Sequence, residues 1–351
     1  MNIITVVFCV LVVFNFAMAV PTMIARKQSE MNTVQYTDGN SPEADSEMPN
    51  IYYLLFDEYS GYNFMLKYYE YDNSVFIEKL KSKNFSVSYS SYNESVSTET
   101  VITNLMNLNY VVDDSWTSYD KSEVRKNGEL YKLLTKHGYK LYSLTDRYGL
   151  PLIDEQEGEN EAVTISGETL RSILIKNTVV YPLLSVNRQG LQTTIDSIER
   201  FICREEKSRF FISHLLLPHQ PFIFDRDGNI IKNVNTNWKD KKYYLDQFIY
   251  ATKVMEELID CILKHDPDSI IILQSDHSAR ASTDSDIFKV VFKMEDMTNC
   301  FNCVYYMGKP VDIEGLSGVN TDRLLLSMLL DEELPPLEVP RLEVNGFDKG
   351  E

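Results

Sequence analysis

Basic residues are scarce in this sequence relative to acidic ones. Its 351 residues include 34 Lys and Arg against 52 Asp and Glu, which gives a formal net charge of −18. A field of that sign repels a phosphate backbone, so we expect no nucleic-acid partner. It does not exclude a small phosphorylated substrate, because a metal bound in the site would supply positive charge.

Cysteine is also rare, with five in the chain. Cys9 lies in an apolar N-terminal run, and Cys203 and Cys261 fall in apolar helical patterns, which predicts that these two are small buried core residues. Cys300 and Cys303 form a lone CxxC pair. Without a second pair or a nearby histidine it is weak evidence for zinc, and a disulfide there would require an oxidising compartment.

No Lys or Arg precedes the long apolar run from Ile3 to Ala25. The run is long enough to span a bilayer as a helix, and the missing positive segment favours a retained anchor. Ala17-Met18-Ala19 resembles a cleavage site, so secretion after signal cleavage is the alternative. We therefore predict a membrane anchor or signal peptide over 1–27, a polar linker over 28–48, an extracytoplasmic domain over 49–340 and a C-terminal tail over 341–351.

Apolar strand-like runs alternate with amphipathic helical patterns beyond Pro49. This alternation predicts an α/β layered fold, with a mainly parallel central sheet and helices on both faces. The expected strands are 51–56, 85–90, 139–144, 210–217, 269–274 and 301–307. The expected helices are 73–83, a helix beginning at Thr98, 128–136, 191–204, a long helix around 245–262, and 320–331.

Acids and histidines follow several of the expected strands. Asp57 ends the first, the segment around His214 and His219 ends another, and Asp276-His277 follow "IIILQS". Ligands bind at the carboxyl edge of parallel sheets, and carboxylate and imidazole together suit a divalent metal. Asp57 alone would also suit a cap or turn, and His214 would also suit a satisfied core position.

A nucleophile is expected in the hydroxyl-rich segment "SVSTETVITNLMNLNY" at 95–110. Hydroxyls at a helix start usually serve as caps. A helix N-terminus also attracts anions, and a hydroxyl beside a divalent cation is able to attack phosphorus.

The order "PNIYYLLFDEYSG", a Thr-rich helix start, "HLLLPHQPF" and "SDHS" resembles the alkaline phosphatase superfamily. It is most similar to bacterial membrane-anchored sulfatase-like proteins, related to lipoteichoic acid synthases and phosphoethanolamine transferases. The resemblance implies a metal-dependent phosphotransferase or phosphoesterase of the cell envelope. Its substrate would be a phosphorylated envelope glycan or lipid. The phosphoryl group would be transferred through a phospho-threonine intermediate.

The resemblance also implies roles for individual residues. Thr98 would be the nucleophile, with Thr100 as runner-up, and Thr98 would join Asp57, Asp276 and His277 around the metal. This cofactor would be at least one divalent ion, Zn or Mn. His219, His214 and Arg280 would bind the substrate, and the two histidines would alternatively hold a second metal.

Departures from the family pattern leave two alternatives. Sulfatases need a Cys or Ser in a CxPxR or SxPxR context, and "TETVI" replaces it here, which argues against a sulfuric ester hydrolase. Ser278 stands where the family has Gly and Glu58 follows Asp57, which would suit a non-catalytic envelope binding module with a decayed site. The sequon at Asn93 lies close to Thr98, so we predict an unglycosylated, bacterial protein.

Overall fold

The computed structural model describes residues 48–145, 190–203, 206–235, 240–279 and 294–340, all of which lie in one compact unit. Its main sheet has six strands in the order β2-β8-β7-β1-β4-β3. β1 pairs in parallel with β4 and β7, and β3 pairs in parallel with β4, whereas β8 runs antiparallel to both β7 and β2. The strands are β1 (Ile51–Phe56), β2 (Ser86–Ser88), β3 (Lys140–Thr145), β4 (Arg209–Leu215), β7 (Ile270–Ser275) and β8 (Asn302–Tyr306).

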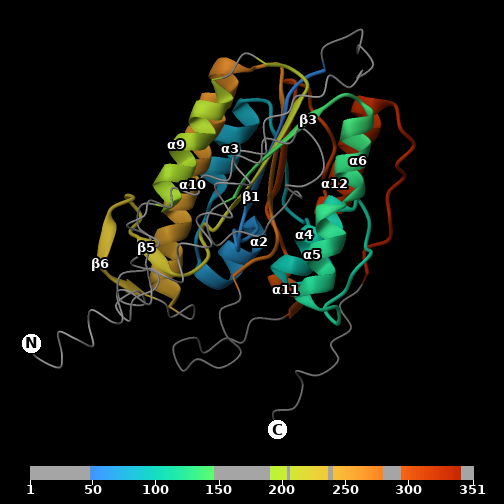
Figure 1. The fold of residues 1–351 in the computed structure, drawn as a ribbon. Helices are drawn as coiled ribbons and strands as arrows, with labels where there is room; N and C mark the ends of the chain where they lie inside the picture. The colour runs from blue at the N-terminus through green and yellow to red at the C-terminus, as the bar shows by residue number, and fades with distance from the viewer. Residues whose placement is uncertain (1–47, 146–189, 204–205, 236–239, 280–293, 341–351) are drawn as a thin grey trace, which may run out of the picture. The chain divides into compact units, whose positions relative to one another are not determined.

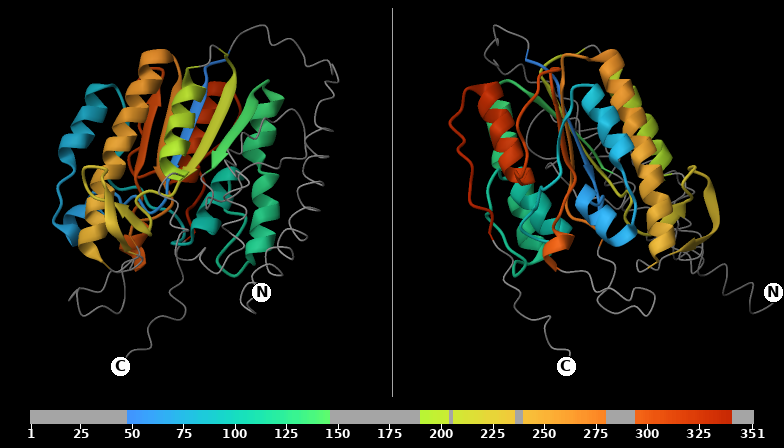
Figure 2. Two further views of the ribbon diagram at one scale, coloured as in Figure 1. Left: turned by 60° about the vertical axis from the view of Figure 1, so that its left-hand side comes forward. Right: turned by 180° about the vertical axis from the view of Figure 1, so that it is seen from behind.

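Helices cover both faces of this sheet (Figures 1 and 2). One face carries α3 (Ser74–Ser82), α9 (Gly190–Ile202) and α10 (Lys241–His265). The other carries α4 (Thr98–Met106), α6 (Glu129–Lys136) and α12 (Gly318–Leu330), with α5 (Ser118–Lys126) packed on α4. The predicted fold class, a mainly parallel sheet between two helix layers, is confirmed.

β1 shows why the central strands are largely apolar. Tyr52, Leu54 and Phe56 lie in the core under α3, α9 and α10, and the residues between them lie in the core under α4, α6 and α12. A strand buried on both faces has no side in contact with solvent, so it shows no alternation of polar and apolar residues. The result is the unbroken run "IYYLLF".

Several short elements were not expected from the sequence. They are α2 (Tyr62–Phe64), the π-helical turn η1 (Met65–Tyr69), the hairpin of β5 (Phe222–Phe224) and β6 (Ile230–Asn235), and α11 (Met294–Met297). Within the described ranges no helix combines the length and the apolar character that a membrane span requires. The predicted anchor over 1–27, Arg280 and the tail 341–351 lie outside the described residues.

The cysteines depart in part from the prediction. Cys203 is exposed and Cys261 is only partly buried, so the prediction that both are core residues is wrong. Cys203 follows the last residue of α9, where the chain leaves the helix, and the apolar pattern around it belongs to the helix itself. Cys300 and Cys303 are buried free thiols, not a disulfide.

Asp322 of α12 is a buried acid beside Tyr53 and Gln274. Tyr53 Oη lies 2.7 Å from Gln274 Oε1 and 2.8 Å from Asp322 Oδ2. A tyrosine has a single hydroxyl proton, so a protonated Asp322 supplies the second hydrogen bond. Burial raises the pKa of Asp322 to about 8, against smaller opposing effects of the neighbouring Tyr53 and Gln274 side chains.

We expect Asp322 to make the free energy of unfolding decrease as pH rises from about 4 to about 8. Over that interval the folded chain keeps a proton on Asp322, and the unfolded chain, with the ordinary pKa of 3.8, has released it. Asp322→Asn should remove a slope of up to about 1.4 kcal/mol per pH unit. Urea unfolding at a series of pH values measures it, with the exposed Asp331→Asn as control. Equal slopes in wild type and Asp322→Asn would contradict the assignment.

Candidate active site

The register of the sheet brings Asp57 and Asp276 to the same place. Phe56, the last residue of β1, pairs with Ser275, the last residue of β7. The next residue in each parallel strand is an aspartate, so the two carboxylates emerge at one level of the carboxyl edge. Glu58 N and His277 N both donate to Asp276 Oδ1 at 2.9 Å, which fixes that carboxylate.

Thr98 reaches the same edge from α4. Val101 and Leu105 of this helix pack in the same core as Leu55 of β1, so the N-terminus of α4 lies over the strand ends. Thr98 Oγ1 lies 3.3 Å from His277 Nε2. The N-terminus of a helix is favourable for an anionic group, because its backbone N–H groups and dipole point there.

The donor atoms at this edge fit a divalent cation. Ligand atoms of Asp57, Asp276 and His277 all lie within 4.8 Å of one another, and all three residues are buried. Asp57 Oδ1 and Asp276 Oδ2 are buried without a hydrogen-bond partner. A buried carboxylate oxygen without a donor is costly, and a metal ion removes that cost.

The imidazole of His277 supports the same conclusion. Its Nδ1 lies 2.7 Å from Ser278 O, which only accepts hydrogen bonds, so Nδ1 carries a proton. In the neutral ring Nε2 therefore presents a lone pair, at 3.1 Å from Asp276 Oδ2. Two facing lone pairs repel unless a cation lies between them. A backbone carbonyl that orients a histidine in this way is typical of metal ligands.

Two further histidines surround Asp57. His214 of β4 is in register with Leu55, and its Nε2 lies 3.3 Å from Asp57 Oδ2. His219, in the loop after β4, donates its backbone N–H to Asp57 O at 3.3 Å. Burial alone would raise the pKa of Asp57. A positive charge on His219 and a hydrogen bond from His214 hold the pKa of Asp57 well below its usual range.

Thr100 lies in a different environment from Thr98. Its Oγ1 donates to Asp114 Oδ1 at 2.7 Å, and the residue is only 1% exposed. The structure therefore brings Thr98, Asp57, Asp276, His277 and His214 together and leaves Thr100 engaged with Asp114. Arg280 lies outside the described residues.

Two residues that were not predicted from the sequence hold the loops after β1 and β7, which carry Asp57 and Asp276. Asn93 Nδ2 donates to Ser275 O and Asp276 O, at 3.2 and 2.8 Å. That nitrogen would carry an N-linked glycan, and Asn93 is 4% exposed, which agrees with an unglycosylated site. Tyr244 of α10 donates to Glu58 O at 2.8 Å. In the sequence, the only indication of these two roles was a polar residue within a loop, for Asn93, or within an apolar helical pattern, for Tyr244.

Ser278 also helps to hold these loops in place. Its Oγ accepts from Gly61 N at 3.2 Å and donates to Asn299 O. The hydroxyl thus ties the loop after β1 to the segment before β8.

No protein-family model and no curated protein matches this sequence, but solved structures do. The C-terminal periplasmic domain of EptC from Escherichia coli, solved in complex with zinc, matches with a TM-score of 0.53 and 14% identity, over 82% of this chain and 84% of that one. The lipoteichoic acid synthase LtaP from Listeria monocytogenes gives 0.52 and 14%, over 90% and 80%. The chain has an alkaline-phosphatase-like fold.

Two more structures share this alkaline-phosphatase-like fold. The lipooligosaccharide phosphoethanolamine transferase A from Neisseria meningitidis matches with a TM-score of 0.52 and 12% identity, over 88% of this chain and 60% of that one. The putative sulfatase yidJ from Bacteroides fragilis matches with 0.53 and 14%, over 86% and 77%. At such identities the likeness establishes the fold, and the activity depends on the site.

Proposed function

We propose that this protein is a metal-dependent phosphotransferase or phosphoesterase of the cell envelope, with Thr98 as its nucleophile. The observation that carries the proposal is the position of Thr98 Oγ1, 3.3 Å from His277 Nε2 and beside two buried carboxylates with unpartnered oxygens. Asp57, Asp276 and His277 would hold a Zn or Mn ion, with Thr98 Oγ1 as a further ligand.

The chemistry follows from this arrangement. A divalent cation bound here would lower the pKa of the Thr98 hydroxyl and offset the charge of the phosphoryl oxygens. Thr98 Oγ1 forms a bond to phosphorus, the bond from phosphorus to the leaving oxygen breaks, and the hydroxyl proton is lost to solvent as the leaving oxygen is protonated. A water or acceptor hydroxyl then attacks phospho-threonine and restores Thr98. His219, beside Asp57, would contact a substrate oxygen.

An envelope lipid or glycan carrying a phosphoester is the proposed substrate. The lipooligosaccharide phosphoethanolamine transferase and the lipoteichoic acid synthase that share the fold support this class. The apolar segment 3–25 would place the domain at a membrane. Sulfate-ester hydrolysis is disfavoured, because Thr98 has no thiol or CxPxR context from which formylglycine is made.

Metal-dependent turnover tests this function. The full-length chain, purified in mild detergent and treated with a chelator, should not turn over an activated aryl phosphodiester. Added Zn or Mn should restore activity, and the matching aryl sulfate should remain uncleaved. Lack of phosphodiester turnover at saturating metal would contradict the proposed enzyme, and cleavage of the sulfate in preference would indicate a sulfatase.

A further inference from the structure

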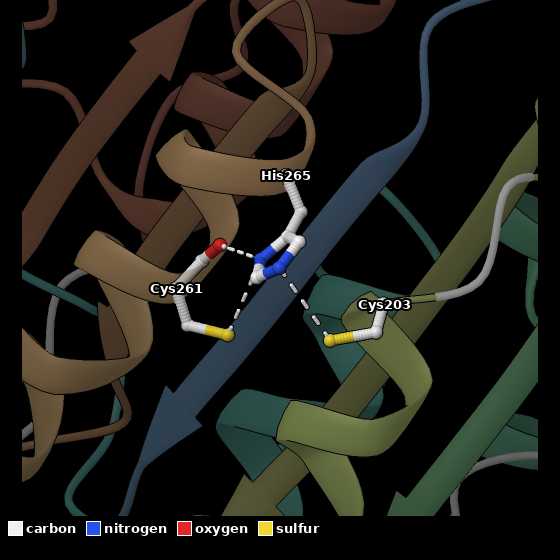
Figure 3. A group of neighbouring side chains, drawn as sticks. All are labelled: Cys203, Cys261 and His265. Carbon is white, nitrogen blue, oxygen red and sulfur yellow. Dashed lines mark hydrogen bonds between the residues drawn. The ribbon is translucent and has the colours of Figure 1, made fainter.

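A second group of metal-ligating side chains lies away from the active site. Cys203 follows α9, and Cys261 and His265 lie one helical turn apart on α10 (Figure 3). α9 leads toward the start of β4, and α10 leads toward the start of β7. The group is therefore at the amino ends of the parallel strands, opposite the carboxyl edge of the sheet that holds Asp57 and Asp276. β7 has six residues, a separation of about 20 Å along the strand.

The three side chains converge with distances suited to tetrahedral zinc. Cys203 Sγ lies 3.8 Å from His265 Nε2, and the ligand atoms of all three residues lie within 4.8 Å of one another. With Zn–S near 2.3 Å and Zn–N near 2.0 Å, tetrahedral ligand atoms are about 3.5 to 3.8 Å apart. Small side-chain movements are therefore enough to close the site around an ion.

The ring of His265 is already oriented for ligation through Nε2. Its Nδ1 lies 2.9 Å from the backbone oxygen of Cys261, so the proton is on Nδ1. Nε2 then carries the lone pair, and it faces Cys203 Sγ (Figure 3). A backbone carbonyl that fixes the tautomer of a histidine is the usual support of a metal-bound imidazole.

The donor set is suited to a metal that binds thiolate. Two thiols and one imidazole face one another in this group, and a coordinated metal deprotonates such thiols outright.

We infer that Cys203, Cys261 and His265 form a second, zinc-type metal site that joins the end of α9 to α10. Two thiolates and one imidazole select zinc over magnesium, calcium or manganese, which prefer oxygen ligands. The fourth position is left to water or another ligand, because Cys203 and His265 are at the surface. The site differs from the catalytic one in its donors, in its position and in its role, which is to hold two helices together.

Cobalt(II) distinguishes the two sites, because its bond to thiolate gives a charge-transfer absorption that carboxylate and imidazole ligands do not give. The full-length chain in mild detergent, reduced with a phosphine, should develop this absorption with one equivalent of cobalt at the thiol site. Cys203→Ser and Cys261→Ser should each lose the wild-type band. His265→Ala should weaken cobalt binding by at least about tenfold.

Matched variants separate this site from the rest of the chain. His137→Ala, a histidine at the end of α6, and Asp276→Ala, in the catalytic site, should both keep the thiolate band. The inference is overturned if the reduced wild type shows no thiolate band at saturating cobalt, or if the band persists in Cys203→Ser. It is also overturned if peptide mapping of the native chain without reductant finds Cys203 joined to Cys261 as a disulfide.

Discussion

Thr98→Ala should abolish turnover of an activated phosphodiester and leave the catalytic metal in place. Thr98 supplies the proposed nucleophile, whereas Asp57, Asp276 and His277 remain to hold the ion. Loss of a nucleophile that acts within a catalytic unit costs about 10⁴-fold or more in rate. The measurement is initial-rate kinetics at saturating metal, together with the Mn content of the same preparation.

Thr100→Ala is the matched control, because it removes a hydroxyl two residues away that is engaged with Asp114. It should keep substantial activity, with a loss of stability of about 1 kcal/mol from the broken, partly buried hydrogen bond. The assignment of Thr98 is wrong if Thr98→Ala turns over substrate at nearly the wild-type rate and Thr100→Ala does not.

Asp276→Ala and His277→Ala should each remove Mn from the catalytic site. Asp276 and His277 supply two of the three clustered ligand residues, and Asp276 Oδ2 is one of the two unpartnered carboxylate oxygens in that cluster. Loss of either ligand should weaken Mn binding by at least about 10- to 100-fold, the range known for residues that only support a ligand. Equilibrium dialysis followed by metal analysis measures the effect.

Mn is the right probe for this comparison, because the thiols of Cys203 and Cys261 bind it poorly. Asp312→Ala, which removes an exposed carboxylate between β8 and α12, is the control. This variant should bind Mn as the wild type does. If Asp276→Ala binds Mn with wild-type affinity, the ion is held elsewhere and the proposed site is incorrect.

The central strands and the acids that follow them were predictable, because burial on both faces requires a run of apolar residues that is visible in the sequence. β1 is apolar throughout and β7 is apolar over its first four residues, since helices cover both sides, and Asp57 and Asp276 follow directly where the strands end. Only the parallel register, Phe56 beside Ser275, shows that the two aspartates are neighbours. Pairing between strands more than two hundred residues apart leaves no local signal.

Other parts of the site had no signal of that kind. Asn93 holds the carbonyls of Ser275 and Asp276, yet it resembles any loop asparagine until the fold brings the segments together. Tyr244 fits the apolar face of α10 and also supports Glu58 O. Cys203 was assigned to the core because a helical pattern continues up to it, although α9 ends one residue earlier. In each case a tertiary contact, rather than local periodicity, determines the role.

Peptide mapping of the trapped covalent enzyme tests the central claim most directly. The full-length, metal-loaded chain is mixed with excess activated phosphodiester, quenched in acid before turnover is complete, digested and analysed by mass spectrometry. The proposed mechanism predicts a phosphoester adduct on Thr98 that is absent from Thr98→Ala and from the chelator-treated wild type. An active enzyme whose adduct lies on Thr100, or on another residue, would contradict it.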